Sequence, residues 1–514
     1  MKAMKKGLSL LLTLTLLCAF ALPFHAGAAD DAIAITNPYA NVNWETVRTY
    51  KTALHTHTNA SDGSCTLKES IERHLEAGFD IVATTDHGTV NYSWSEPNPN
   101  KLIHGVLETL GRTGGDLQYL GDSGAFDNGV SYTCGAAANG DDYLTADNGR
   151  VILRVPYGIE NNAVSVNAHV NGWFADYADN SVTTYEDAVR GVAAAGGVCV
   201  INHPGEYTKA RYELRSENAY DQTNPAYRYY TDKFANLISK YDACIGIDVN
   251  SKGDNRTRFD RILWDELLRR FSANGENVFA IASSDAHQVH VIDTGFSLML
   301  MPELTSAALR NAMENGEFFP ASHCLGNYDE LMDIAAALKE FYGETALYQK
   351  VSGTAEEMRA RVEAIESGEL PADEDIGITY STLDENGRFS GASFPSVNAI
   401  SVDDAENTIA LSAGDALIVR LISGGKLLDT KKADAAVFDL DDYGDALGDY
   451  VRLEVFGEGG ILYTQAFLLN AAENAGSSRV VSPTYLNLGF LDFLLAEFHK
   501  LLGILSRFFS NLIP

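Results

Sequence analysis

The sequence has few cysteines, and none of them lies in the close pairs that build zinc knots. One of the six, Cys18, falls in an N-terminal apolar run. The other five include no CxxC spacing and lie at positions 65, 134, 199, 244 and 324. An odd number without that spacing implies neither a disulfide framework nor a cysteine-based zinc site. Cys199 and Cys244 lie in the apolar runs GVCVIN and ACIGIDV, where a free thiol behaves as a small hydrophobic group.

Basic residues are also scarce. The chain has 38 Lys and Arg against 70 Asp and Glu, which gives a formal net charge of −32. Such a field repels nucleic acid and anionic lipid, so we expect no nucleic-acid partner. A phosphorylated substrate would need positive charge concentrated inside the site, and metal ions could provide it.

The balance of hydrophobic and charged residues excludes two further classes of protein. With 46% hydrophobic and 21% charged residues, the chain is neither disordered nor a multi-span membrane protein. Its 514 residues exceed what one hydrophobic core normally serves, so two or three domains are expected.

The first 28 residues have the layout of a cleavable signal peptide. Lys2, Lys5 and Lys6 precede an apolar run from 7 to 22, and Ala-Gly-Ala at 26–28 follows it. Leu17 before Cys18 is larger than the residue that a lipoprotein signal requires, so a lipid anchor is not expected there. The segment predicts a secreted or cell-surface protein.

The stretch LHTHTNASDG, residues 54–63, reads as half of a metal site. In an extended segment His55 and His57 point to the same side, and Asp62 can return from the following turn. Histidines two apart on a half-buried strand are as often structural as ligating, so this stretch alone leaves both readings open.

Repetition along the chain favours the metal reading. Short apolar runs alternate with helical stretches, such as the one opened by the capping box Thr66–Glu69 and ended at Gly78. Ligand-type side chains follow the apolar runs again and again, and they are His55, His57, Asp62, His87, Glu160, His169, His203, Asp285 and His287. In a parallel β/α barrel the strand ends converge on one face, whereas structural histidines have no reason to gather there. The pattern therefore predicts one site with several metal ions.

These motifs resemble the PHP family, named for its polymerase-associated and histidinol phosphatase members. The matching motifs are HxH with SDG, then TDH, GIE, an isolated His, NHP and SDAH, over roughly residues 50 to 322. The resemblance implies an α/β fold with a distorted (β/α)7 barrel over residues 45–322.

The same resemblance implies two or three divalent ions, Zn, Mn or Fe. The first would be held by His55, His57, Glu160 and Asp285, the second by Glu160, His169 and His203, and the third by Asp62, His87 and His287. Glu160 would bridge the first two. Asp86, next to a ligand, would fix the tautomer of an imidazole.

Closely spaced divalent ions lower the pKa of a bridging water and deliver hydroxide, so hydrolysis of a phosphomonoester or phosphodiester is the leading functional hypothesis. Lys209, Arg211, Lys252 and Arg256 follow the ligands and could bind the phosphate, although basic residues in polar loops are more often solvated. His290 could be a general acid or a surface histidine.

Segments outside the motifs are assigned by pattern. Residues 88–157 include a long Gly-, Asp- and Asn-rich insertion, either a lid whose aromatic residues Trp94, Tyr119, Tyr132 and Tyr143 stack on a substrate, or a solvated or calcium-binding decoration. Residues 323–370 predict a helical insertion, 371–471 a β-sandwich domain and 472–484 a linker. Residues 485–514 predict an amphipathic helix, for which packing on the protein or a partner is slightly favoured over a membrane surface.

Two alternatives to phosphoester hydrolysis remain open. A barrel followed by ALRNAMENGEFFPAS and sandwich strands resembles the carbaryl-hydrolase-like branch of the family, which implies a carboxylic ester or carbamate as substrate. The second alternative is a non-catalytic protein that stores or senses metal, or binds glycan through the sandwich.

Overall fold

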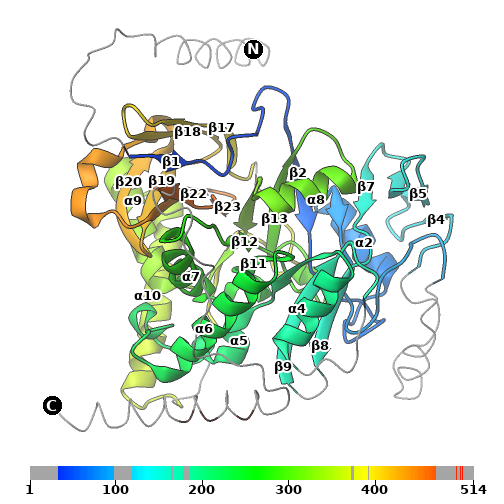
Figure 1. The fold of residues 1–514 in the computed structure, drawn as a ribbon, viewed down its shortest axis with the longest axis horizontal. Helices are drawn as coiled ribbons and strands as arrows, with labels where there is room; N and C mark the ends of the chain where they lie inside the picture. The colour runs from blue at the N-terminus through cyan, green and yellow to red at the C-terminus, as the bar shows by residue number, and fades with distance from the viewer. Residues whose placement is uncertain are drawn as a thin grey trace.

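The computed structural model describes residues 33–97, 119–163, 166–177, 184–371, 376–391 and 393–470, with residues 494, 498 and 501. The predicted signal peptide and linker, and nearly all of the predicted helix 485–514, lie outside them. The described chain is a mixed α/β protein in which helices cover several sheets (Figure 1). None of its helices combines the length and the apolar content that a bilayer crossing would require.

The first motif-bearing strands form the middle of a large sheet. Strands β2 (Arg48–Ala53), β3 (Ile81–Val82) and β7 (Val151–Arg154) are parallel, while β13 (Gly295–Met301) runs antiparallel to β2. Helix α2 (Leu67–Glu76) joins β2 to β3, and its predicted capping box is confirmed because the Thr66 side chain accepts from the backbone N–H of Glu69.

A second sheet carries the later motifs. Its order is β12-β11-β10-β9-β8. The strands are β8 (Ile159–Ala163), β9 (Val166–Trp173), β10 (Val198–Ile201), β11 (Cys244–Asp248) and β12 (Phe279–Ile281). The last three are parallel, each preceded by a helix, and these helices are α4 (Tyr185–Ala194), α6 (Pro225–Lys240) and α7 (Asp260–Ser272).

The two sheets meet at the ends that carry the motifs. Parallel bridges join Thr56 to Ala286 and His87 to Glu160. The β8–β9 hairpin is antiparallel, so Glu160 and His169 come from neighbouring strands rather than from the ends of two parallel ones. The seven-stranded barrel stays a prediction.

The described part of the insertion extends the first sheet at its edge. Strands β4 (Ser123–Ala125), β5 (Ser131–Ala136) and β6 (Asp142–Ala146) add to β7 in antiparallel order. Trp94 is fully buried, Tyr132 is buried, and the Tyr143 hydroxyl donates to the Leu304 carbonyl over 2.8 Å. These three aromatic residues therefore serve packing, and substrate stacking by them is not supported.

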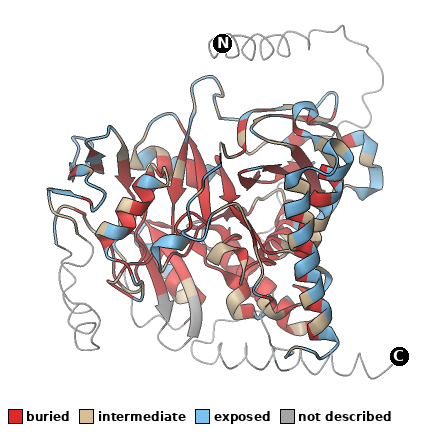
Figure 2. Cartoon of the chain, turned by 180° about the vertical axis from the view of Figure 1, so that it is seen from behind, coloured by how far each residue is buried: buried red, intermediate tan, exposed pale blue. Residues whose placement is uncertain are grey.

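Helices separate the two β-rich parts of the chain. Helix α8 (Ser306–Asn315) leads into β14 (Phe318–Ser322), and β15 (Cys324–Leu325) precedes α9 (Tyr328–Tyr342) and α10 (Ala346–Glu366). Helix α10 buries one stripe that includes Val351, Met358 and Val362, and its other side is exposed (Figure 2).

The C-terminal β region, residues 396–469, contributes two antiparallel groups of strands. The first group is β17 (Ser396–Asp403), β18 (Thr408–Gly414) and β21 (Val437–Asp439). The second is β19 (Ile418–Ser423), β20 (Lys426–Lys432), β22 (Tyr450–Gly457), β23 (Gly460–Tyr463) and β24 (Phe467–Leu469).

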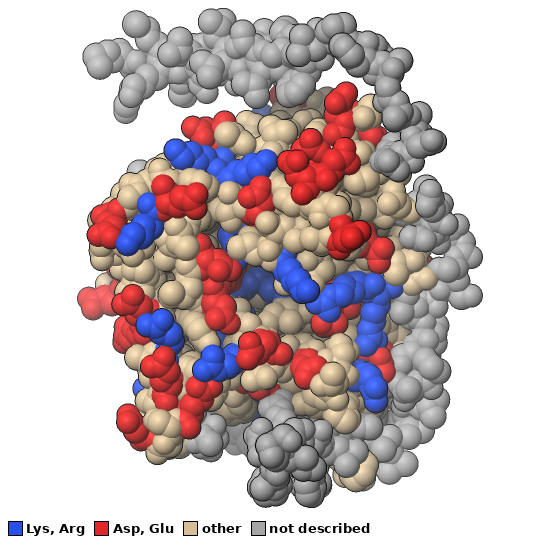
Figure 3. Space-filling view, turned by 90° about the vertical axis from the view of Figure 1, so that its left-hand side faces the viewer, with Lys and Arg blue, Asp and Glu red and all other residues tan. Residues whose placement is uncertain are grey.

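This second group is continuous with the first motif-bearing sheet. Strand β23 pairs with β14, with Ala321 opposite Leu462 and Ser322 opposite Ile461. Strand β24 pairs with β1 (Ile35–Thr36), so the first and last described strands are neighbours. On the face in Figure 3, acidic and basic side chains are interspersed, so the excess negative charge forms no single patch there.

Candidate metal centre

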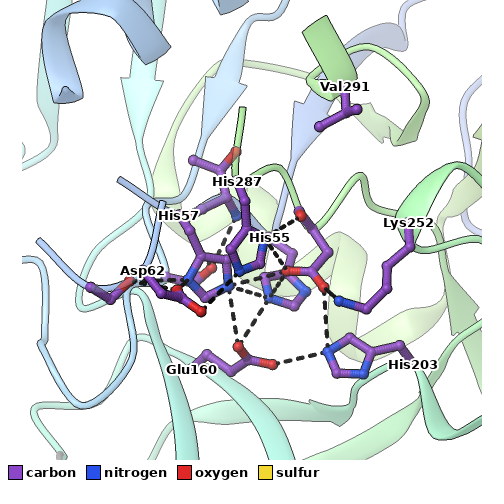
Figure 4. Close-up of polar contacts among 12 residues, drawn as sticks. His55, His57, Asp62, Glu160, His203, Lys252, His287 and Val291 are labelled. Carbon is purple, nitrogen blue, oxygen red and sulfur yellow. Dashed lines mark hydrogen bonds and ion pairs between the residues drawn. The ribbon is translucent and has the colours of Figure 1, made fainter. Parts of the chain in front are cut away.

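All nine predicted ligands lie together where the two sheets meet. Figure 4 labels His55, His57, Asp62, Glu160, His203 and His287 among them. Within each of three groups, one donor atom per residue lies within 4.8 Å of the others. The groups are His55, His57, Glu160 and Asp285; His57, Asp62, His87 and His287; and His87, Glu160 and His169. Histidine nitrogen and carboxylate oxygen are the donors that Zn, Mn and Fe accept.

Glu160 lies at the centre of the site and is 1% exposed. Its Oε1 is 2.9 Å from Nδ1 of His169 and 3.3 Å from Nε2 of His203. Its Oε2 is 3.1 Å from Nδ1 of His87 and 3.2 Å from Nε2 of His57. One carboxylate thus faces imidazoles on both sides, as a bridging ligand must.

His55, His57 and Asp285 form the most deeply buried group. The two Nε2 atoms face each other at 3.0 Å, and Oδ1 of Asp285 lies 3.2 Å from the first and 3.1 Å from the second. Asp285 adopts a left-handed backbone with φ 47°, which is uncommon outside glycine and concentrates at functional sites.

The group of Asp62, His87 and His287 is more open. Oδ2 of Asp62 lies 3.2 Å from Nε2 of His287 and 3.6 Å from Nε2 of His87, and the Asp62 side chain is 36% exposed. The turn that returns Asp62 requires Gly63, because a Cβ there would come within 2.8 Å of the His57 carbonyl carbon.

The geometry differs in detail from the expected distribution of ligands. His87 lies close to Glu160 and His169 as well as to Asp62 and His287. His203 lies between groups, with Nε2 3.3 Å from Glu160 and 3.6 Å from Oδ2 of Asp285. Which ion each of these histidines holds stays a prediction.

Burial and mutual proximity shift the pKa values of the site. Burial alone would raise the pKa of Glu160 and Asp285, but the surrounding imidazoles, and for Asp285 also the Lys252 ammonium, hold both pKa values well below the ordinary range. Burial lowers the pKa of His87 to about 3 and that of His203 to about 4. These four groups therefore stay in the deprotonated forms that bind metal.

The buried donors fit divalent cations. Oε2 of Glu160 and Oδ1 of Asp285 are buried without a hydrogen-bond partner in the described parts of the chain. Unpartnered polar atoms at this depth are costly unless something else satisfies them, and a cation among them would do so.

Asp86 is linked to the His57 imidazole through the hydroxyl of Ser61. Its Oδ1 accepts from the Thr58 backbone N–H and the Ser61 hydroxyl, each at 2.7 Å. The Ser61 oxygen lies 3.2 Å from Nδ1 of His57. A role of Asp86 in fixing the His57 ring stays a prediction. In this geometry Asp86 would act on the ring through Ser61.

A pocket of about 300 Å³ opens onto the metal centre. It is lined by Asp62, His87, Glu160, His169, Glu206, Tyr207, Lys252, Arg256, Asp285 and His287. No residue of the described parts of the insertion, 88–97 and 119–157, is in that lining, so the lining gives no support to a lid formed by these parts.

The basic candidates separate into two sets. Lys252 and Arg256 line the pocket, and Arg211 lies behind them, with Nη1 3.5 Å from Oε1 of Glu206. Lys209 is exposed, with its Nζ 5.7 Å from the centre of the Tyr212 ring. It is outside the lining, which does not support its predicted contact with substrate.

His290 also falls outside the pocket lining. It lies in the short 3-10 turn η4 (Val289–Val291), and its side chain is exposed. Of the two readings of this residue, the surface histidine agrees with the structure, because a general acid must reach the leaving group inside the pocket.

Two pocket residues were missed by the sequence reasoning. The Tyr207 hydroxyl lies 2.8 Å from Nε2 of His169. Glu206 holds Lys252 with Oε2 at 3.3 Å and Arg256 with Oε1 at 3.0 Å. Both lie on α5 (Pro204–Thr208), which starts immediately after His203. Residues three and four positions beyond a ligand share its side of a helix, and that spacing was a usable signal.

Comparisons with known proteins give structural matches only. No family model matches the chain, and no curated protein matches it in sequence. A two-domain protein from Bacteroides vulgatus, containing a predicted PHP-like metal-dependent phosphoesterase, is 14% identical to this chain. The match covers 86% of this chain and 100% of that one, with a TM-score of 0.32. The family in that description is the one that the ligand motifs resemble.

Two further structures match about half of the chain. PsfC from Pseudomonas syringae is 14% identical, over 50% of this chain and 84% of its own, with a TM-score of 0.27. An amidohydrolase from Chromobacterium violaceum with bound sulfate and no metal is 15% identical, over 46% of this chain and 87% of its own, with a TM-score of 0.25. The case for the present site rests on its own residues.

Proposed function

We propose that this protein is a metal-dependent hydrolase of the PHP type that cleaves a phosphoester. The observation that carries the proposal is the ring of imidazoles and carboxylates around Glu160, whose two oxygens face His169 and His203 on one side and His57 and His87 on the other. A distorted (β/α)7 barrel is the fold that we propose for this part of the chain.

The chain's own residues would hold two or three divalent ions. His55, His57 and Asp285 would bind on one side of Glu160, His169 and His203 on the other, and Asp62, His87 and His287 at the mouth. Such ions, when bound, supply Lewis acidity and a water of lowered pKa. The identity of the metal and the number of ions belong to the proposal.

With metal ions bound to offset its carboxylates, the pocket would favour a phosphate over an uncharged ester. Lys252 and Arg256 line it, and Glu206 is shared between them. A phosphomonoester brings two negative charges that both cations can meet, whereas a carboxylic ester or carbamate brings none. We therefore place the carboxylic ester second and a purely metal-binding protein third.

A chelator-controlled screen tests the proposal. The protein without residues 1–28 is stripped of metal, reloaded separately with Zn, Mn and Fe, and assayed on phosphomonoesters, phosphodiesters and carboxylic esters. We expect bound metal in more than one equivalent and hydrolysis of phosphoesters that chelator abolishes. A metal-loaded protein that is inactive on every phosphoester would contradict the proposal, and activity confined to carboxylic esters would establish the second candidate.

The location of the protein is a separate proposal. We propose that residues 1–28 direct export and are then removed, as their lysines, apolar run and Ala-Gly-Ala indicate. Mass spectrometry of the protein from the culture medium should find a mature N-terminus close to Ala29, and an intact leader in the cytoplasm would contradict the proposal.

A further inference from the structure

Lys252 lies in a backbone turn that few sequences adopt. Three consecutive residues have positive φ: Lys252 at 53°, Gly253 at 62° and Asp254 at 61°. Only glycine enters this region freely, so the two neighbours must be held there by contacts made elsewhere. The turn matters because it places the Lys252 ammonium against Asp285 and Glu206 in the pocket (Figure 4).

A single arginine holds both flanks of this turn. Arg261, on α7, donates through Nη1 to the side-chain oxygen of Asn250, which precedes Lys252 by two residues. It also donates to both carboxylate oxygens of Asp254, which follows Lys252 by two, at 3.2 Å each. Asp254 is fully buried and takes a third bond, of 2.8 Å, from the Gly326 backbone N–H.

Arg261 is in turn tied to the C-terminal β region. Its Nη2 donates to Oε2 of Glu330 on α9 at 2.6 Å. Nη1 of Arg420 on β19 lies 3.3 Å from the other oxygen of Glu330, and Arg420 also pairs with Glu454 on β22. The side chains of Arg261, Glu330, Arg420 and Glu454 are between 4% and 8% exposed.

The network returns to α7 through Arg452. Arg452 on β22 pairs with Glu454, and its Nε and Nη2 lie 2.9 and 2.8 Å from the two oxygens of Asp265. A continuous chain of charge pairs therefore runs from the turn at Lys252 to the C-terminal β region and back to α7.

Buried charge pairs are a poor source of net stability, because the cost of removing them from water offsets much of their attraction. Their directionality is the better explanation here. A guanidinium fork fixes the distance and the angle of two carboxylates at once, which an apolar contact cannot do. The fork of Arg261 spans the turn that carries Lys252, one of the two basic residues that line the pocket.

We propose that Arg261 is a positioning residue for Lys252, and that the C-terminal β region sets the pose of Lys252 through Glu330 and Arg420. This inference rests on the proposed function, in which Lys252 meets the phosphate of the substrate. It assigns the C-terminal β region a role in substrate binding although none of its residues lines the pocket.

The test is a double-mutant cycle on the full metal-loaded protein, with orthophosphate as the probe and calorimetry as the measurement. Arg261→Lys keeps the charge and loses the fork, and Glu330→Gln keeps the shape and removes the charge. Each is made alone and in a Lys252→Met background. Asp142→Asn is the matched control, because it breaks the buried 2.9 Å pair with Arg154 at the far edge of the first sheet.

We expect Lys252→Met to weaken phosphate binding roughly 30-fold and Arg261→Lys about tenfold. In the Lys252→Met background, Arg261→Lys should weaken binding further by less than about twofold, because the residue it positions is gone. Glu330→Gln should behave like a milder Arg261→Lys, with a raised KM and a nearly unchanged kcat. Asp142→Asn should lower the melting temperature and leave phosphate affinity unchanged.

The proposal is overturned if Arg261→Lys weakens phosphate binding equally in both backgrounds, or lowers only the melting temperature as the control does. If Arg261→Lys does not fold, Glu330→Gln decides by the same criteria. A crystal structure of either variant gives a readout independent of activity. If the wild-type protein neither hydrolyses esters nor binds phosphate, the proposed function fails, while a Lys252 ammonium still in contact with Asp285 in the variant would overturn the positioning role.

Discussion

The hydroxyl of Tyr207 lies 2.8 Å from Nε2 of His169, and the other nitrogen of that ring lies 2.9 Å from Oε1 of Glu160. The imidazole is therefore held from both ends. An outer contact of this kind fixes the tautomer and the orientation of a histidine and raises its strength as a ligand.

Tyr207→Phe should consequently weaken metal binding about tenfold, since loss of such a contact costs ten- to hundredfold in affinity. Competition against a chromophoric chelator measures the change. Tyr92→Phe is the control, because its hydroxyl bonds Asp176 at an exposed position. Equal affinities of the wild type and Tyr207→Phe would show that the ring needs no such support.

Glu160→Gln should remove the bridge while preserving the volume of the side chain. We expect the metal content after dialysis to fall by at least one equivalent and kcat to fall more than about a hundredfold, because ligands on both sides lose their shared carboxylate. Elemental analysis and single-substrate kinetics measure these effects. Glu317→Gln, a buried glutamate on the approach to β14, should retain the wild-type metal content.

Removal of metal should lower the melting temperature. The site gathers buried carboxylates and imidazoles whose donors lack other partners, so we expect the folded chain to bind cations more tightly than the unfolded chain. Linkage predicts about 2.7 kcal/mol of added stability at a free metal concentration 100 times Kd. Thermal unfolding across a titration of Zn or Mn checks this, and a melting temperature independent of metal would argue against a metal centre.

Lys252→Met should raise KM for a phosphomonoester by roughly 30-fold, the effect of losing about 2 kcal/mol of binding. Lys209→Met should leave KM unchanged, because Lys209 lies outside the pocket lining. Steady-state kinetics of the two variants compare two lysines, 43 positions apart, for which the sequence predicts the same role in phosphate binding. Equal effects would move the phosphate site away from Lys252.

His74 should make stability sensitive to acid. It is fully buried on α2, it donates from Nδ1 to the Ser70 carbonyl over 2.7 Å, and burial lowers its pKa to about 3. The unfolded chain takes up this proton near the ordinary pKa of 6.5 and the folded chain does not. The free energy of unfolding should therefore decrease as the pH falls from 6.5 toward 3, by up to about 1.4 kcal/mol per pH unit from this residue.

Urea unfolding of the wild type and His74→Gln between pH 7 and pH 4.5 measures that slope. The variant should be less stable at pH 7 and should lose less stability on acidification. A wild-type slope identical to that of His74→Gln would mean that His74 is protonated in the folded state.

The sequence predicted that the candidate ligands would lie together, because their signal is local. A polar residue after an apolar run marks the end of a strand, and His55, His203 and Asp285 could each be placed this way. Glu206 and Tyr207 lie three and four positions beyond His203, but that spacing becomes informative only once a helix is known to begin there, and apolar periodicity does not reveal a helix of five residues.

Long-range contacts were beyond the sequence for a different reason. The pairing of β14 with β23 joins residues about 140 positions apart. The alternation of apolar and polar residues in a strand does not indicate which other strand it pairs with. The Lys252 turn is similar. A Lys-Gly-Asp tripeptide predicts a turn, but the left-handed backbone of its outer residues depends on Arg261 and Gly326.

The pairing of β1 with β24 has a consequence for the order in which the molecule is completed. Ile35 lies opposite Leu469, and the Tyr39 hydroxyl accepts from the backbone N–H of Gln465. During synthesis β1 can therefore pair only after β24, more than 400 residues later in the chain, has been made. In a chain that ends before Phe467, β1 would lack its partner strand β24. The first described strand is thus among the last to be paired.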